Sequence, residues 1–321
     1  MTDVKSPTKT KTIYIYVPFP KCKHFWHFMM GEFMPIVSII AKTKASNVII
    51  YNEERDWGQA FDKFYKDITT KSLKIKLVNA GKLKKHPGVQ KIIDTSTQYD
   101  ITNYKWDWRW NTEDIKECNR AVRWLKKRSL KYMEDRANTG TKSIISNNSS
   151  TTNSSTTNSI IDINKINTSN KSNNTSKSTR KKEVIIQLRK DTQHLTTYFK
   201  KAKVGISNDY GAKRRKVANL DKIGELISNA ISDSNNKNNI TVRIVSTDGL
   251  HLYVQIFPYI NKKNIWLGHG AGMFFTLFMK NGSNVVEIIP LSKVKELNGA
   301  AQGLKRIADD MKNFHLDRII L

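Results

Sequence analysis

The chain has 321 residues and a formal net charge of +27, from 55 Lys and Arg against 28 Asp and Glu. Its 7 Trp, 11 Tyr and 12 Phe can build cores, which excludes a fully disordered chain, and its two cysteines exclude a disulfide scaffold. We expect both thiols, those of Cys22 and Cys118, to be free and packed.

Short apolar stretches alternate with helical patterns in the first part of the chain. Strands are predicted at residues 13–17, 47–51 and 73–78. Helical spacing covers residues 25–41, residues 56–68 and a segment that begins at Thr112, a predicted N-cap. Pro35 predicts a break or kink in the first of these helices, because proline has no N–H to donate.

Residues 138–182 differ from the rest of the chain. They are rich in Ser, Thr and Asn, and residues 146–159 include no large apolar side chain at all. Such a tract cannot bury enough apolar area to offset the entropy of an ordered backbone. We therefore predict a disordered linker between an N-terminal domain, residues 1–137, and a C-terminal domain, residues 183–321.

After the linker the same alternation returns. Strands are predicted at residues 184–188, 241–245, 264–267 and 284–289. Helices are predicted at residues 219–231, 252–260, 272–279 and over the last 30 residues. Strands that alternate with helices favour parallel sheets with crossover helices. The predicted fold class is therefore α/β, with two Rossmann-like domains that face a cleft.

The segment Gly268-His269-Gly270-Ala271-Gly272 lies between a predicted strand and a predicted helix. Glycines let a backbone approach a ligand closely, and a helix N-terminus offers free N–H groups and a partial positive charge. The pattern indicates a cradle for a phosphate or a sugar hydroxyl. The alternative is a tight turn with a structural histidine.

Glu287 lies near the end of the next predicted strand. An acid at the carboxyl end of a parallel strand lies at the edge where open sheets bind ligands, and such acids often bind ribose hydroxyls. A buried carboxylate is costly without a partner, so Glu287 needs a donor nearby. The alternative is an edge glutamate whose oxygens accept from backbone amides.

Residues 269–290, HGAGMFFTLFMKNGSNVVEIIP, resemble the signature of glycosyltransferase family 61. Two further segments are similar to that family in the same order: Arg189 just after a strand, and Arg214-Arg215 ahead of a helix. The segment from His24 to Pro35 resembles an aromatic, histidine-containing segment of its first domain. The Asn, Lys and Ile bias is typical of an AT-rich viral or protist genome.

The resemblance implies a GT-B architecture and an inverting, metal-independent transfer of a sugar from a nucleotide sugar, most simply a UDP-sugar. The acceptor would be a hydroxyl of a glycan or a protein. No metal or other cofactor is expected, and the sequence has no Cys and His cluster with zinc spacing. Diphosphate charge would then be stabilised by cationic side chains and a helix N-terminus.

The resemblance also assigns roles to residues. The expected donor-binding residues are Arg189, Arg214, Arg215, Gly268, His269, Gly270, Ala271, Gly272 and Glu287. Inversion needs a base for the acceptor hydroxyl, and the candidates are His27 and Glu32. They are five residues apart, so an α-helix would not place them on quite the same face. The alternatives are a packed histidine and a glutamate on the helix surface.

A second function class stays open from the charge alone. A basic surplus suggests a polyanionic partner, so the alternative is a basic nucleic-acid-binding or structural protein on a degenerate transferase fold. Because the surplus is spread along the chain, with one cluster at residues 200–216, we expect nucleic-acid binding to be weak, non-specific and steeply salt-dependent.

Two negative expectations complete the sequence prediction. The longest apolar run, residues 33–41, is about half of what a membrane helix needs, so no membrane span is predicted. The polar N-terminus is not followed by an apolar segment, so no secretory signal is predicted and the expected location is the cytoplasm, or a host cytoplasm.

Aromatic residues at 104–110 could stack on a sugar ring or belong to a core.

Overall fold

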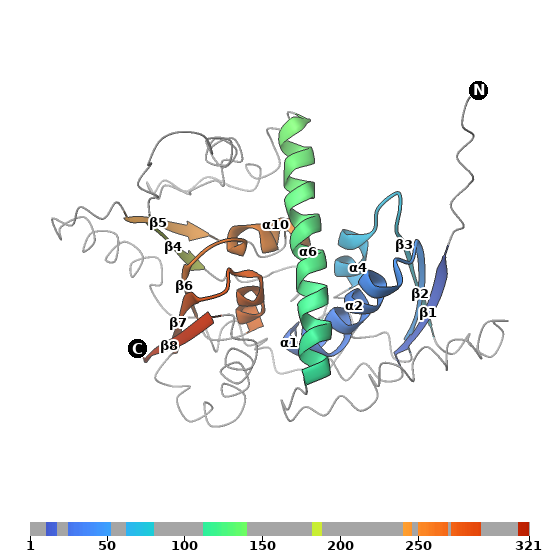
Figure 1. Ribbon diagram of the computed structural model, residues 1–321, viewed down its shortest axis with the longest axis horizontal. Helices are drawn as coiled ribbons and strands as arrows, with labels where there is room; N and C mark the ends of the chain where they lie inside the picture. Colours follow the sequence, from blue (N-terminus) through green and yellow to red (C-terminus); the bar gives the residue numbers. More distant parts are fainter. Residues whose placement is uncertain are drawn as a thin grey trace, which may run out of the picture. The chain divides into compact units, whose positions relative to one another are not determined.

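The structure is a computed structural model and shows a mixed α/β chain with parallel sheets (Figure 1). The residues that it describes are 11–17, 25–52, 62–79, 112–139, 182–187, 240–245, 250–268, 271–289 and 314–320. The chain divides into two compact units, Met1–Leu125 and Lys126–Leu321. This division falls before the boundary predicted at 137/138, and residues 140–181 of the predicted linker lie outside the described residues.

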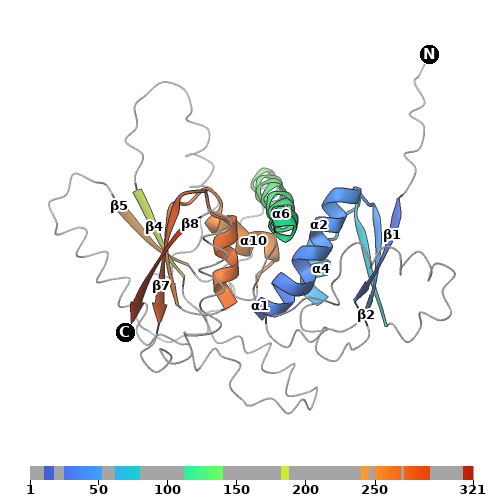
Figure 2. The same cartoon turned by 60° about the horizontal axis from the view of Figure 1, so that its bottom comes forward.

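A three-stranded parallel sheet forms the centre of the first unit. Its strands are β1 (Thr12–Val17), β2 (Asn47–Asn52) and β3 (Lys74–Asn79), in that order. Alternate residues of β1 are buried, as expected for a strand with one face against a core. Helices α2 (Met34–Thr43) and α4 (Asp62–Ile68) lie on one face of this sheet (Figures 1 and 2). The three strands predicted in this part of the chain are confirmed.

The predicted irregularity at Pro35 is a π-helical turn. Helix α1 (Phe25–Phe28) continues through η1 (Met29–Phe33), a π-helix, into α2, where Pro35 lies in the first turn. Proline cannot donate to the carbonyl four residues earlier, and a wider turn keeps the helix continuous without that bond. The N–H of Met34 accordingly donates to the carbonyl of Met29, five residues before it.

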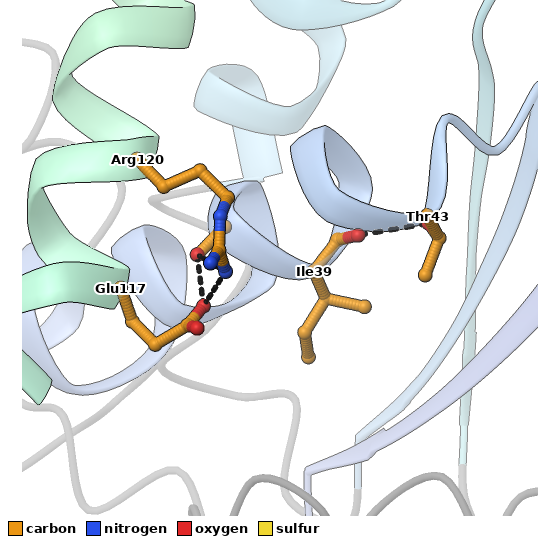
Figure 3. Close-up of polar contacts among 5 residues, drawn as sticks. Ile39, Thr43, Glu117 and Arg120 are labelled. Atoms are coloured by element: carbon orange, nitrogen blue, oxygen red, sulfur yellow. Dashed lines mark hydrogen bonds and ion pairs between the residues drawn. The ribbon is translucent and has the colours of Figure 1, made fainter. Parts of the chain in front are cut away.

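Helix α6 (Thr112–Asn138) is the long green helix of Figure 1, and its first half packs in the first unit. The fully buried hydroxyl of Ser38, on α2, donates to the carboxylate of Glu117, which also accepts from Arg120 (Figure 3). This polar contact fixes one turn of α6 against α2. On α2 itself, the hydroxyl of Thr43 donates to the carbonyl of Ile39 at 2.8 Å.

The second unit has a five-stranded sheet in which every neighbouring pair is parallel. The strand order is β5-β4-β6-β7-β8. The strands are β4 (Lys182–Gln187), β5 (Ile240–Val245), β6 (Asn264–Gly268), β7 (Ser283–Ile289) and β8 (Phe314–Ile320). Such a sheet is compatible with a Rossmann-like fold.

Two helical segments lie on one face of this sheet (Figure 2). The first is α10 (Leu252–Ile256), followed by the short 3-10 helix η4 (Phe257–Tyr259). The second is η5 (Ala271–Phe278), a 3-10 helix that follows β6 directly in the chain. Helix α10 is capped by His251, whose Nδ1 accepts from the backbone N–H of Tyr253.

One prediction at the C-terminus is wrong. The last 30 residues were expected to be helical, but residues 314–320 form the edge strand β8 among the described strands. Pairing with β7 over seven residues decides this conformation, because tertiary contacts override local propensity. The predicted helix at 219–231 and the aromatic residues at 104–110 lie outside the described residues.

Among the helices of the described ranges, none combines the length and the apolar character that crossing a bilayer requires. Helix α6, with 27 residues, has the length but carries charged side chains on most of its turns.

Cys118 provides a test of the packing of α6. It is a free, buried cysteine, as predicted, and burial raises its thiol pKa to about 12. Because the thiolate is the reactive form and free thiols have a pKa near 8.5, Cys118 should be almost fully protonated at pH 8. In a Cys22→Ser variant we expect no reaction with a thiol-specific chromogenic reagent in native buffer at pH 8, and stoichiometric reaction in guanidinium. Rapid labelling of the native protein would contradict this packing.

Candidate functional site

The strand order of the second unit reverses between β4 and β6. In chain order, β4 is the first strand of the sheet, its neighbour β5 is the second, and β6 on its other side is the third. In open parallel sheets of this kind, ligands bind outside the carboxyl ends of the strands at such a reversal. The candidate site is therefore at the carboxyl ends of β4 and β6, which Gln187 and Gly268 occupy.

Four side chains form one row across this end of the sheet. Gln187 on β4 is in register with Leu267 on β6, which is in register with Glu287 on β7 and through it with Arg318 on β8. Residues opposite each other in a sheet point to the same face. The row thus carries three polar side chains, from Gln187, Glu287 and Arg318, on the face that Leu267 shares.

Glu287 is buried and has a strong partner. Its side chain is 2% exposed, and Nε of Arg318 donates to its Oε2 at 3.0 Å. The expectation that this acid needs a nearby donor is confirmed, and the donor is a guanidinium rather than a set of backbone amides alone. Contact of Glu287 with a ribose stays a prediction.

The first turn of η5 lies close to the end of β4 at Gly272. A Cβ atom placed on Gly272 would lie 3.3 Å from Oε1 and 3.6 Å from Nε2 of Gln187. Gly272 is the second residue of η5, so the amide of Gln187 lies against the first turn of that helix. Glycine at this position allows the first turn of η5 to approach the end of β4.

The other end of η5 is held by the second half of α6. Nζ of Lys126 donates to the carbonyl of Met279 at 2.8 Å, just after the last residue of η5. Burial lowers the pKa of Lys126, and the cation lies at the negative end of the helix, where it is stabilising. One turn later, the buried hydroxyl of Ser129 donates to the carbonyl of Tyr253 at 2.6 Å.

Several predicted donor-binding residues fall outside the described part of the chain. They are Arg189, Arg214, Arg215, His269 and Gly270. Of Ala271 only the backbone is described. Arg189 follows the last residue of β4 by two positions, and His269 follows the last residue of β6 by one. The adjacent parallel strands that precede them therefore end side by side.

The two candidate bases belong to the first unit. Glu32 is 3% exposed, in the π-turn, and the hydroxyl of Tyr65 on α4 donates to it at 2.9 Å. The alternative of a helix-surface charge is therefore wrong, because aromatic packing around the π-turn encloses this carboxylate. The rings of Phe33 and Tyr65 are 5.5 Å apart.

The π-turn also corrects the expected geometry of His27 and Glu32. Residues five apart are stacked along it, as the 5.8 Å separation of the Phe28 and Phe33 rings shows. His27 and Glu32 each precede one member of that pair, so their backbone positions share a face. The side chain of His27 lies outside the described residues.

Sequence reasoning missed Gln187 and Arg318. A signal for Gln187 was present, because it is the polar residue that closes an otherwise apolar strand just before Arg189. Arg318 was hidden by the helical interpretation of the C-terminus. In a strand, the alternation of Phe314, Leu316 and Arg318 would have placed it on the face of Glu287.

No protein-family model matches the chain, and the curated proteins contain no match to it. Within the described ranges, no group of three or more His, Cys, Asp or Glu side chains is arranged to hold a metal ion.

The Glu287–Arg318 pair gives a stability test. Arg318→Leu removes one partner of a buried ion pair, which typically costs about 3–5 kcal/mol, and the partial exposure of Arg318 favours the lower end. The double variant with Glu287→Leu should recover most of the loss, because an apolar pair replaces the charges. Urea unfolding measures both, and Asp317→Asn, an exposed neighbour, is the control. An unchanged midpoint for Arg318→Leu would show that the pair contributes little.

Proposed function

We propose that this chain is an inverting glycosyltransferase that uses a nucleotide sugar, with UDP-sugars as the first candidates. The observation that carries the proposal is the reversal of strand order between β4 and β6, with the first turn of η5 beginning three residues after the end of β6. A helix N-terminus at a reversal point is suited to a diphosphate. The resemblance of residues 269–290 to family 61 narrows this ligand to a nucleotide sugar.

The proposed chemistry divides between the two units. In a GT-B arrangement of two Rossmann-like domains, the second unit binds the donor, and the first unit supplies the base and binds the acceptor, a glycan or protein hydroxyl. The bond from the acceptor oxygen to the anomeric carbon forms as the bond from that carbon to the diphosphate breaks. The hydroxyl proton passes to the base, and the nucleoside diphosphate leaves.

Charge stabilisation on the leaving diphosphate needs no metal in this proposal. Arg189 and His269 would donate to the phosphate oxygens, Arg214 or Arg215 would add a positive charge, and the free N–H groups of the first turn of η5 would complete the set. Glu287 would bind ribose hydroxyls. Such a contact would be made by a buried carboxylate that already accepts from Arg318.

His27 is a better candidate for the catalytic base than Glu32. A base must reach the acceptor hydroxyl within hydrogen-bond distance. Glu32 is enclosed and accepts from Tyr65, so its first role is to fix α4 against the π-turn. His27 stands on the same face one turn earlier, and an imidazole can take a proton near neutral pH.

The test is donor hydrolysis together with donor binding. Arg189→Ala should lower the hydrolysis rate of a UDP-sugar about ten- to a hundred-fold, and more than it weakens binding, because phosphate charge grows in the transition state. His269→Ala should behave similarly, and Glu287→Ala should mainly weaken binding. Calorimetry with UDP and a hydrolysis assay measure the two effects.

Arg123→Ala, at an exposed position of α6, is the matched control for loss of a positive charge. If the parent binds oligonucleotides but no nucleoside diphosphate, the basic nucleic-acid-binding alternative gains and the transferase proposal fails. If the parent binds UDP and the three variants turn the donor over as the parent does, the donor site is elsewhere.

A further inference from the structure

Exposed cations recur along one side of helix α6. Lys116, Arg123, Lys127 and Lys131 are exposed and Arg120 is half-buried, and we call these five residues the basic stripe. Steps of three and four residues keep them within an arc of about 80° on a helix of 3.6 residues per turn. All five belong to one continuous helix (Figure 1), so the row follows from helical geometry alone.

Acidic side chains compensate the basic stripe only towards its ends. Between residues 116 and 131 the one acid is Glu117, and Arg120 already donates to its carboxylate. Beyond the other end, Asp135 accepts from Nζ of Lys131 at 3.0 Å, and both side chains are exposed. An exposed pair of this kind is weak and is screened by salt, so a polyanion can compete for its lysine at little cost.

The centre of the basic stripe keeps an uncompensated positive charge. Within the part of the chain that the structure describes, Arg123 and Lys127 enter no ion pair. They are four residues apart, where two like charges disfavour a helix. A polyanion on this side of α6 would relieve that repulsion, and the long stems of both side chains allow their charged groups to adjust to it.

The shape and chemistry of the basic stripe favour a nucleic acid over a lipid surface. From Lys116 to Lys131 the helix rises about 22 Å, which is the axial length of about six phosphates on one strand of a duplex. A helix that binds a membrane inserts an apolar face. The apolar residues Val122 and Leu125 of α6 are buried in the protein instead, and Leu130 is its one exposed large apolar residue among the described positions.

We propose that the basic stripe binds the phosphate backbone of a nucleic acid. Contacts to phosphates position a protein on a strand without reading its sequence, so the binding is independent of sequence and steeply salt-dependent. This surface adds a second class of ligand to the one in the proposed function. It uses none of the donor-site residues, so the two proposals can fail separately.

The experiment measures the affinity for a fluorescent oligothymidylate of about 20 nucleotides by anisotropy, between about 50 and 200 mM salt. The double variant Arg123→Gln with Lys127→Gln removes the two central cations and keeps a residue of similar helix propensity. It should weaken binding about ten- to a hundred-fold at about 50 mM salt, and lower the slope of log affinity against log salt by about 1.4. Lys74→Gln with Lys76→Gln is the matched control, because it removes the same charge from exposed positions of β3 and should bind nearly as the parent does.

Two further variants separate a charge contact from a defect in folding. Exchange of the two central residues, Arg123→Lys with Lys127→Arg, should bind as the parent does, because a phosphate contact of this kind depends on charge. If the double glutamine variant does not fold, Lys127→Gln alone should give about half of its change in slope.

Three results would overturn the proposal. An equal loss of affinity in the two double glutamine variants would show that net charge alone accounts for the binding. Failure of the parent to bind the oligonucleotide at about 50 mM salt would exclude the site, as would a preference for phosphatidylserine vesicles over the oligonucleotide. None of these results bears on UDP binding, which tests the proposed function alone.

Discussion

The parallel pairing of β4 with β6 is the constraint on which the candidate site depends. It places two chain segments that are far apart in the sequence at one sheet edge, with Gln187 opposite Leu267. Helix η5, which follows β6 in the chain, begins close to the end of β4. A Cβ on Gly272 would lie 3.3 Å from Oε1 of Gln187, so the glycine gives the amide room at this approach.

The electrostatics of this edge depend on the neutralisation of Glu287. An unpaired buried carboxylate on β7 would repel any anion near the ends of β6 and β4, which lie about 5 Å and about 10 Å away, one and two strand spacings. Arg318 from β8 compensates the charge, and its side chain is partly exposed while the carboxylate is not. The row across the sheet consequently presents a neutral amide and a balanced ion pair.

The sequence predicted much of the fold but only part of this site. Short β-branched runs such as those of β1, β2, β6 and β7 were found because a buried parallel strand is a continuous apolar run. At Pro35 the sequence predicted only a break or kink in the helix. It did not predict the π-turn, because the width of that turn depends on how the chain replaces the hydrogen bond that proline cannot donate. Strand β8 was not predicted, because its conformation comes from pairing with β7. Arg318, the partner of Glu287, lies on β8 and was therefore not predicted either. A partner across a sheet is a property of register, which a single sequence does not give.

Helix η5 is stabilised in part by a residue that is far from it in the sequence, Lys126. A 3-10 helix has poorer hydrogen-bond geometry than an α-helix, so eight residues of it depend on packing for their stability. Its rings provide part of that packing, with Phe274 and Phe278 5.4 Å apart. Lys126 holds its last turn through the carbonyl of Met279, and the amide of Gln187 lies against its first turn. With its negative end bound by a lysine, the helix is oriented so that its positive end meets the amide of Gln187.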